Sequence, residues 1–220
     1  MFKSYTFLFF FFRLVKKILK IKKIKFLNSI FVSEEEIEND KSFFEKNSYL
    51  KNIYVIGNFQ SEKYFENYKK EILENFNFNQ QKSINFLKDY NSLNIENTVA
   101  LGIREFEEAP KKNLDKIGGV ENERFYNNSI SYFKKKLKDP FFIVFSTKGN
   151  EIIKKLDISK DKFIFVNNLN TNLSSQETII LMSKFKYFII SNSTFYWWAA
   201  YISEMNNKNI DIIPSKNFVN

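Results

Sequence analysis

Three stretches of this chain combine side chains that can bind an anion or a sugar, and the first surrounds an arginine. Arg104 directly follows the apolar run 99–103, and three of the next four residues are glutamates. A guanidinium at the end of a strand donates two parallel hydrogen bonds to a diphosphate, and Gly102 allows the backbone to approach a ligand closely. A surface ion-pair cluster explains the same residues, and the spacing alone favours this simpler interpretation.

The second stretch, residues 191–194, has the sequence Ser-Asn-Ser-Thr and lies between an apolar run and a helical pattern. Backbone N–H groups and hydroxyls at the start of a helix bind anions without a glycine-rich loop. Ordinary helix capping explains the same residues, and it is the better interpretation of this stretch by itself. Both tryptophans of the chain follow, Trp197 and Trp198, and the default role of such residues is core packing.

The third stretch, from Gly57 to Phe65, reads as a turn that leads into a helix. Its polar residues Gln60, Glu62 and Lys63 can contact a sugar. They serve equally well to solvate the first turn of the helix, and composition does not decide between these roles.

The chain has neither cysteine nor histidine. These absences exclude disulfides, thiolate nucleophiles, Ser-His-Asp catalysis and metal sites built from cysteine or histidine. The remaining groups suit a reaction whose difficult step is departure of a phosphate, because arginine stabilises the leaving charge. The net charge of +9 favours anionic partners in general. The chain also has an excess of Lys, Asn, Ile and Phe, which is typical of an AT-rich coding sequence. The positive charge is therefore weak evidence for a nucleic-acid partner, and we expect none.

Residues 1–26 differ in composition from the rest of the chain, because an aromatic run over residues 5–12 leads into a basic stretch. The apolar run is shorter than the roughly 20 residues that span a bilayer, and its charge order is opposite to that of a signal peptide. Apolar residues then recur at helical spacing, which predicts an amphipathic helix on an anionic membrane surface. A core element of a larger domain explains the run equally well.

From residue 98 onward apolar runs alternate with helical patterns, which predicts βαβ units and a parallel, doubly wound sheet. The predicted strands cover residues 99–103, 141–145, 163–166, 187–190 and 210–213. The predicted helices cover residues 123–137, 150–156, 175–185 and 194–203. Ligands of such sheets bind at the carboxyl ends of the strands.

The earlier part of the chain is less regular. Residues 61–76 read as a helix with Ser61 as its N-cap, and an Asn-rich linker follows. We therefore divide the chain into the segment 1–26, the remainder of an N-terminal domain over 27–95, and a C-terminal domain over 96–220.

Two of the three stretches resemble sequence blocks of the bacterial α-1,2-fucosyltransferase family. Residues 189–200, Ile-Ile-Ser-Asn-Ser-Thr-Phe-Tyr-Trp-Trp-Ala-Ala, are similar to the block I-x-N-S-[ST]-F-S-W-W-A-A. Residues 57–65 are similar to the block G-[YF]-[FW]-Q-S-E-K-Y-F.

The arginine stretch falls on a third block of that family, H-x-R-R-G-D. Only its first arginine is present, as Arg104, whereas Gly102 stands at the histidine and Glu105 at the second arginine. Three blocks in the same order make the resemblance specific, and it extends over about residues 7–218.

The resemblance implies an inverting, metal-independent transfer of L-fucose from GDP-fucose to O2 of a galactoside, without a cofactor. It implies a GT-B-like α/β fold, with a Rossmann-like C-terminal sheet for the nucleotide sugar and a partial N-terminal α/β domain. Arg104 and Glu107 are the implied catalytic residues. The residues implied to bind GDP-fucose are Gly102, Arg104, Ser146, Asn192, Ser193, Thr194 and Phe195. The residues implied on the acceptor side are Gln60, Glu62 and Lys63.

The family opens with a glycine-rich block, G-G-L-G-N-Q, that this sequence lacks. We therefore expect a chain that begins late relative to the family, and an inactive remnant that binds a nucleotide sugar is the alternative function. The implied acceptor is a galactose-containing glycan of a surface polysaccharide such as a lipopolysaccharide O-antigen. The expected location is the cytoplasm, at the membrane face where residues 1–26 bind anionic lipid.

Overall fold

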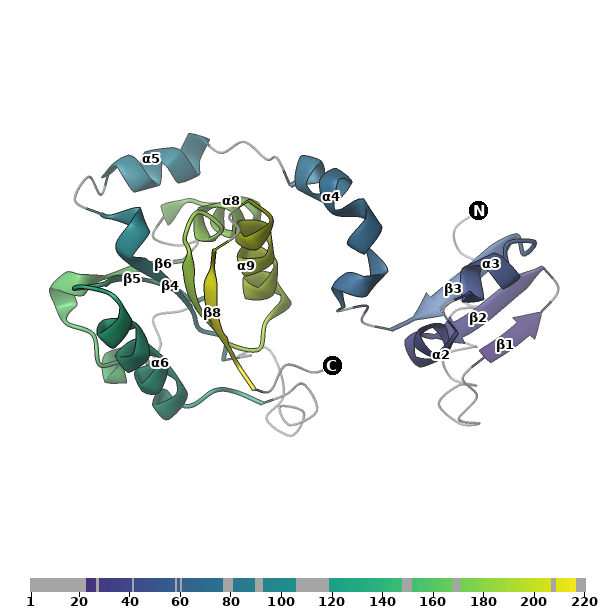
Figure 1. The fold of residues 1–220 in the computed structure, drawn as a ribbon, viewed down its shortest axis with the longest axis horizontal. Coiled ribbons are helices and arrows are strands. Elements are labelled where there is room, and N and C mark those ends of the chain that lie inside the picture. The colour runs from purple at the N-terminus through teal and green to yellow at the C-terminus, as the bar shows by residue number, and fades with distance from the viewer. Residues whose placement is uncertain are drawn as a thin grey trace. The chain divides into compact units, whose positions relative to one another are not determined.

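The computed structural model describes the chain in several ranges, within which it forms two compact units, Met1–Tyr64 and Phe65–Asn220 (Figure 1). The described ranges are 23–26, 28–40, 42–57, 59, 61–76, 81–89, 93–105, 119–147, 152–167, 171–206 and 209–216. Residues 1–22, which hold most of the amphipathic helix predicted within residues 1–26, lie outside these ranges, whereas residues 23–26 form a strand instead of a helix.

The N-terminal unit contains a sheet of order β1-β2-β3, in which β1 and β2 are antiparallel and β2 and β3 are parallel. Its strands are β1 (Lys23–Phe26), β2 (Ser29–Ser33) and β3 (Asn52–Ile56). The helices α2 (Glu34–Asn39) and α3 (Phe43–Lys46) lie in the crossover that a parallel pair requires. The core of the unit is formed by Ile30, Val32, Ile37, Phe43 and Leu50.

The C-terminal unit contains a fully parallel sheet of order β6-β5-β4-β7-β8. Its strands are β4 (Thr98–Gly102), β5 (Phe141–Phe145), β6 (Phe163–Val166), β7 (Tyr187–Ile190) and β8 (Asp211–Pro214). Numbered along the unit, this order is 3-2-1-4-5, so the winding direction reverses between β4 and β7. The predicted Rossmann-like α/β fold is therefore confirmed, with each predicted strand present to within one residue.

Helices cover both faces of this sheet (Figure 1). One face packs on α6 (Glu123–Lys136), and the other packs on α8 (Ser175–Met182) and α9 (Thr194–Asn206). Side chains alternate between the faces along each strand. The α6 face buries Val99, Leu101, Ile103, Tyr126, Ile130, Phe133, Phe142, Val144 and Ile189. The face under α8 and α9 buries Ala100, Ile143, Phe145, Leu181, Met182, Phe188, Ile190, Tyr196, Ala199 and Ala200, among others.

The helices α4 (Lys69–Asn75) and α5 (Gln81–Asp89) belong to the C-terminal unit. The ring of Phe65 stacks on that of Trp198 at 5.3 Å between centroids, and the ring of Phe76 lies 5.2 Å from the same indole. The compact units thus divide between Tyr64 and Phe65, whereas the sequence-based division lies between residues 95 and 96. Aromatic packing on α9 accounts for the difference.

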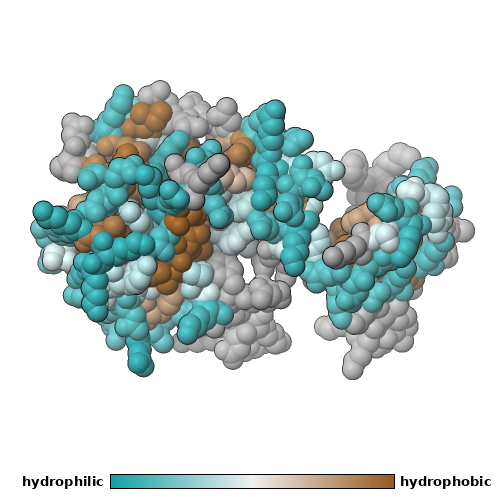
Figure 2. Space-filling view, viewed as in Figure 1, coloured by the Kyte–Doolittle hydropathy of each residue, from teal (hydrophilic) through white to brown (hydrophobic). Residues whose placement is uncertain are grey.

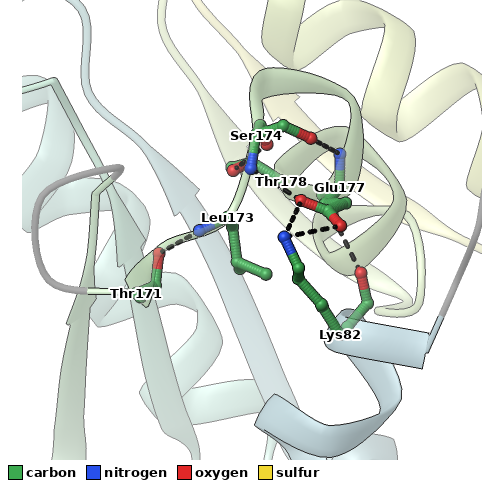
Figure 3. Close-up of polar contacts among 7 residues, drawn as sticks. Lys82, Thr171, Leu173, Ser174, Glu177 and Thr178 are labelled. Carbon is green, nitrogen blue, oxygen red and sulfur yellow. Dashed lines mark hydrogen bonds and ion pairs between the residues drawn. The ribbon is translucent and has the colours of Figure 1, made fainter.

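A polar network fixes α5 to the start of α8 (Figure 3). Ser174 and Glu177 form a capping box, in which the Ser174 N–H donates to the Glu177 carboxylate at 2.8 Å and the Glu177 N–H donates to Ser174 Oγ at 3.2 Å. From α5, Lys82 pairs with the Glu177 carboxylate at 3.3 Å, and the Ser83 hydroxyl donates to the Glu177 carbonyl at 3.0 Å. These contacts fix the element that leads into β7.

Two predicted helices take a different form in the structure. Residues 61–76 fold as two 3-10 turns, η1 (Glu62–Tyr64) and η2 (Glu66–Tyr68), followed by α4. Between the turns Phe65 has φ −135°, outside the helical range, where its ring contacts the indole pair of α9. The helix predicted over residues 150–156 is the 3-10 turn η5 (Ile153–Lys155) in its described part.

The visible surface of the C-terminal unit is mainly hydrophilic, with apolar surface over the edge strand β8 (Figure 2). Three of the four β8 residues are half-buried. Among the described residues, no helix combines the length and the apolar character needed to cross a bilayer.

Candidate functional site

The carboxyl edge of the parallel sheet brings together residues from three adjacent strands. Arg104 lies two residues after the end of β4, Ser146 follows β5 directly, and residues 191–194 connect β7 to α9. The strand ends stay aligned, since the Ile103 N–H donates to the Phe145 carbonyl at 2.9 Å. The structure therefore gathers the predicted donor-binding residues at one edge, beside the point where the winding reverses.

The start of α9 supplies polar groups to this edge. The helix begins at Thr194, which is exposed. In its first turn the backbone N–H of Trp197 donates to the Ser193 carbonyl at 3.0 Å. Asn192 is buried just before the helix. The free N–H groups of a first helical turn attract an anion placed next to them. Phe195 is half-buried and packs its side chain against the core under α9.

Gly102, the last residue of β4, meets the ring of Tyr196. A Cβ atom at Gly102 would lie 2.5 Å from Cγ of Tyr196, closer than two carbon atoms can approach. The close approach expected at this glycine therefore involves an aromatic ring of α9. The Tyr196 hydroxyl donates to the carbonyls of Ile103 and Phe145, at 2.8 and 3.0 Å. Sequence reasoning did not select Tyr196, because a tyrosine next to two tryptophans reads as core.

Two further hydroxyls lie buried at the same edge. The side-chain oxygens of Tyr126, on α6, and Ser191, after β7, make no hydrogen bond within the described part of the chain. Burial raises the pKa of Tyr126 above its ordinary value, the nearby Ser191 hydroxyl partly offsets this rise, and the charges of Glu121 and Glu105 raise the pKa further. Tyr126 is therefore a neutral phenol at pH 7. Sequence periodicity places Tyr126 on the buried face of α6, but the sequence contains no signal that its hydroxyl lies at the carboxyl edge of the sheet.

A cavity of about 600 Å³ opens at the start of α6. The described residues that line it are Glu105, Asn122, Glu123, Arg124, Ile152 and Lys155. Asn122 caps the helix, since its side-chain oxygen accepts a hydrogen bond from the Phe125 N–H at 3.1 Å. The mixed charge of the lining suits a polar ligand that carries both donors and acceptors. No group of three or more acidic, histidine or cysteine side chains in the described ranges could hold a metal ion.

The predicted acceptor-side residues belong to the N-terminal unit. Glu62 and Lys63 are exposed in the 3-10 turn η1, whereas Gln60, like the predicted catalytic residue Glu107, lies outside the described residues. Gly57 is tightly packed, because a Cβ there would lie 2.3 Å from a carboxylate oxygen of Glu34.

Tyr64 lies at the end of η1, in the same segment. Its hydroxyl donates to the Glu38 carboxylate at 2.9 Å, and burial together with this bond raises the pKa of Tyr64 above its ordinary value. Tyr64 is thus hydrogen-bonded to α2, and the side chain of Glu34, the first residue of α2, lies close to Gly57.

The family resemblance is borne out over nearly the whole chain. The family described as Glycosyl transferase family 11 matches residues 9–218. The chain belongs to this family. Within family 11, the three blocks that carry the resemblance fall on the end of β4, the connection from β7 into α9, and the segment after β3.

Two curated relatives come from Escherichia coli. An α-1,2-colitosyltransferase is 30% identical over 210 residues, which cover 90% of this chain and 64% of the relative. The O-antigen biosynthesis glycosyltransferase WbnK is 28% identical over 187 residues, which cover 83% of this chain and 60% of the relative. The chain thus spans less than two thirds of the length of either relative. No solved structure shows a significant match to the chain.

Proposed function

We propose that this protein is a galactoside 2-α-L-fucosyltransferase, which transfers L-fucose from GDP-fucose to O2 of a galactoside during O-antigen synthesis. The observation that carries the proposal is the alignment of Arg104, Ser146 and residues 191–194 on three adjacent strand ends, in a chain of family 11. The names of the two relatives support an α-1,2 linkage and an O-antigen acceptor.

In the proposed reaction the bond between fucose C1 and the β-phosphate oxygen breaks, and its electron pair leaves with GDP. Arg104 donates hydrogen bonds to the β-phosphate and stabilises the charge that develops there. Ser193, Thr194 and the N–H groups at the start of α9 complete the diphosphate site, with Ser146 and Asn192 beside them. The galactoside oxygen O2 attacks C1 from the opposite face, which inverts the configuration, and its proton is released as the new bond forms.

The sugar passes through a transition state with positive charge on the ring, which a carboxylate stabilises. Glu107 is the residue we assign to this role or to orienting Arg104. The proposal needs no metal or organic cofactor, because the arginine and the helix N–H groups supply the charge that a metal would otherwise provide. On the acceptor side we assign Gln60, Glu62 and Lys63.

A second donor is favoured by a specific observation. The colitosyltransferase relative transfers a sugar that differs from fucose only by the absence of the 3-hydroxyl group. A site built to hydrogen-bond that hydroxyl rejects colitose, whereas a site without such a partner accepts both donors. GDP-colitose is therefore the competitor against which GDP-fucose is measured.

The experiment is a calorimetric titration of the purified chain with GDP-fucose, GDP-colitose, GDP-mannose and ATP. We expect selective binding of GDP-fucose, weakened by a factor of about 10 to 100 in Arg104→Ala, since a hydrogen bond to a charged group contributes about 1.5–3 kcal/mol. Arg104→Lys keeps the charge but not the planar fork, and is expected to recover only part of the affinity.

The matched control is Lys138→Ala, which removes one positive charge at an exposed position just before β5, at the opposite edge of the sheet. Binding by the control and loss in Arg104→Ala support the donor site. A folded wild-type chain that binds none of the nucleotide sugars would refute the proposal, whereas a chain that binds GDP-fucose but transfers no fucose to a galactoside would favour the inactive remnant. Preference for GDP-colitose would reassign the donor.

We also propose that the protein works in the cytoplasm at an anionic membrane face, since an O-antigen precursor carried on a lipid is presented there. The basic residues among 1–26 are assigned to this contact. Sedimentation with vesicles that contain an anionic lipid tests the assignment, and equal binding after deletion of residues 1–25 would contradict it.

A further inference from the structure

The Tyr196 side chain is hydrogen-bonded to the two peptide groups that precede Arg104 and Ser146. The Tyr196 hydroxyl lies 2.8 Å from the Ile103 carbonyl oxygen and 3.0 Å from that of Phe145. These carbonyls belong to the peptide planes that join Ile103 to Arg104 and Phe145 to Ser146. Since a peptide group is rigid and planar, a bond to its oxygen also sets the direction in which the next residue leaves the strand. A hydroxyl has one hydrogen, so the two carbonyls share it.

The ring that carries this hydroxyl has little freedom to move. Tyr196 is 4% exposed and packs edge-on against Phe195, with a centroid distance of 5.5 Å. Its ring atoms fill the space above Gly102, where a Cβ would come within 2.5–2.8 Å of three of them. The hydroxyl is thus held between β4 and β5 by packing from β4 on one side and from α9 on the other.

The same helix also presents the polar groups of its first turn. Thr194 begins α9, and Tyr196 stands two residues later, so one rigid element carries both the anion-binding N–H groups and the tyrosine. The Ser191 N–H continues the link, because it donates to the Gly102 carbonyl at 3.2 Å. The ends of β4, β5 and β7 are therefore joined around a single tyrosine side chain.

We propose that Tyr196 is a positioning residue of the donor site, whose hydroxyl fixes the directions in which Arg104 and Ser146 leave the sheet. The inference rests on the proposed function for the identity of the ligand, GDP-fucose. Tyr196 acts through these two residues and does not itself contact the donor. In this arrangement the backbone that carries Arg104 and Ser146 is ordered before a diphosphate arrives, which lowers the cost of ordering the site on binding.

The decisive variant is Tyr196→Phe, which keeps the ring above Gly102 and removes only the oxygen. We expect it to fold, and to bind GDP-fucose about fivefold to tenfold more weakly than the wild type, as the loss of one shared hydrogen bond implies. The control is Tyr132→Phe, which removes a tyrosine hydroxyl bonded to Asp211 at 3.2 Å, at the amino edge of the same sheet. It should leave the affinity unchanged.

A second readout does not depend on the donor. Hydrogen–deuterium exchange of the ligand-free chain should become faster in Tyr196→Phe at the amides of Arg104 and Ser146, but not at the amino edge. Unchanged exchange together with unchanged affinity in a folded variant would overturn the inference. If the wild type fails to bind GDP-fucose, the proposed function fails, and the exchange rates alone decide whether Tyr196 positions the two residues.

Discussion

Replacement of Gly102 by alanine tests the central contact of the site, because it adds a single carbon atom to the end of β4. Gly102 does not have a positive φ, so the backbone itself tolerates any residue there. The added Cβ would lie 2.5 Å from Cγ of Tyr196, whereas ordinary contact begins at 3.4 Å. The ring would have to move by about 1 Å, which would stretch or break its hydroxyl contacts.

The magnitude follows from two contributions. Overpacking of a tight core costs about 1–3 kcal/mol, and a disturbed hydrogen bond to a buried carbonyl adds about 1 kcal/mol. We therefore expect Gly102→Ala to lower the free energy of unfolding by about 3 kcal/mol, which is a fall of about 6–12 °C in Tm for a chain of this size. In a Tyr196→Ala background the obstacle is gone, and the same change should be close to neutral.

The assay is a double-mutant cycle from urea unfolding, followed by far-UV circular dichroism. The expected coupling between the two positions is about 3 kcal/mol, far above the roughly 0.5 kcal/mol scatter of independent sites. Gly102→Ala combined with Tyr132→Ala is the control pair, which should be additive, since Tyr132 is 45% exposed on the other side of the sheet. Coupling near zero between Gly102 and Tyr196 would refute the reasoning, because it would mean that the ring is free to move aside.

Further predictions concern the elements that support the site. Ser174→Ala removes the cap of α8 and should cost about 1 kcal/mol in a thermal melt, whereas Ser175→Ala, one residue on, should cost much less. The Ser174 backbone N–H holds the pKa of Glu177 below its usual 4.5, so the stabilisation is full above pH 4.5 and is lost as the pH falls through the lower folded value. In Glu177→Gln the free energy of unfolding should therefore fall less steeply as the pH is lowered below 4.5. The same steepness as in the wild type would contradict this prediction. Phe65→Ala should shift the tryptophan fluorescence and cost about 1–2 kcal/mol, with Tyr68→Ala, 61% exposed, as the control.

The sheet of the C-terminal unit was predictable because its strands are buried on both faces. Such strands read as continuous apolar runs, as in Phe141–Phe145, and helical patterns of ordinary length separate most of them. The carboxyl-edge placement of Arg104 and residues 191–194 follows from the same alternation, since every parallel strand ends at one edge. Pattern and topology together were sufficient for this part of the site.

Contacts between distant residues were not predictable in the same way. The sequence around Phe65 is typical of a helix, but tertiary packing against Trp198 breaks it into 3-10 turns. Likewise nothing in the sequence distinguishes Lys82 and Ser83 from other residues of a helix surface, but the fold places both beside Glu177. Local propensity is a weak determinant wherever an aromatic ring or an ion pair from another element competes with it.

The arginine block shows how such a contact changes the meaning of a motif. In the family pattern a histidine stands at the position of Gly102 and a serine at that of Tyr196, so the chain departs from the pattern at both places. Taken singly, the loss of the histidine looks like decay of a catalytic motif. In the structure the two positions touch, and the ring at 196 occupies the volume that any side chain at 102 would need. The ring at position 196 therefore requires a residue without a Cβ at position 102, and in this chain the two residues together form a filled strand end, where the Tyr196 hydroxyl donates to the Ile103 carbonyl beside Arg104.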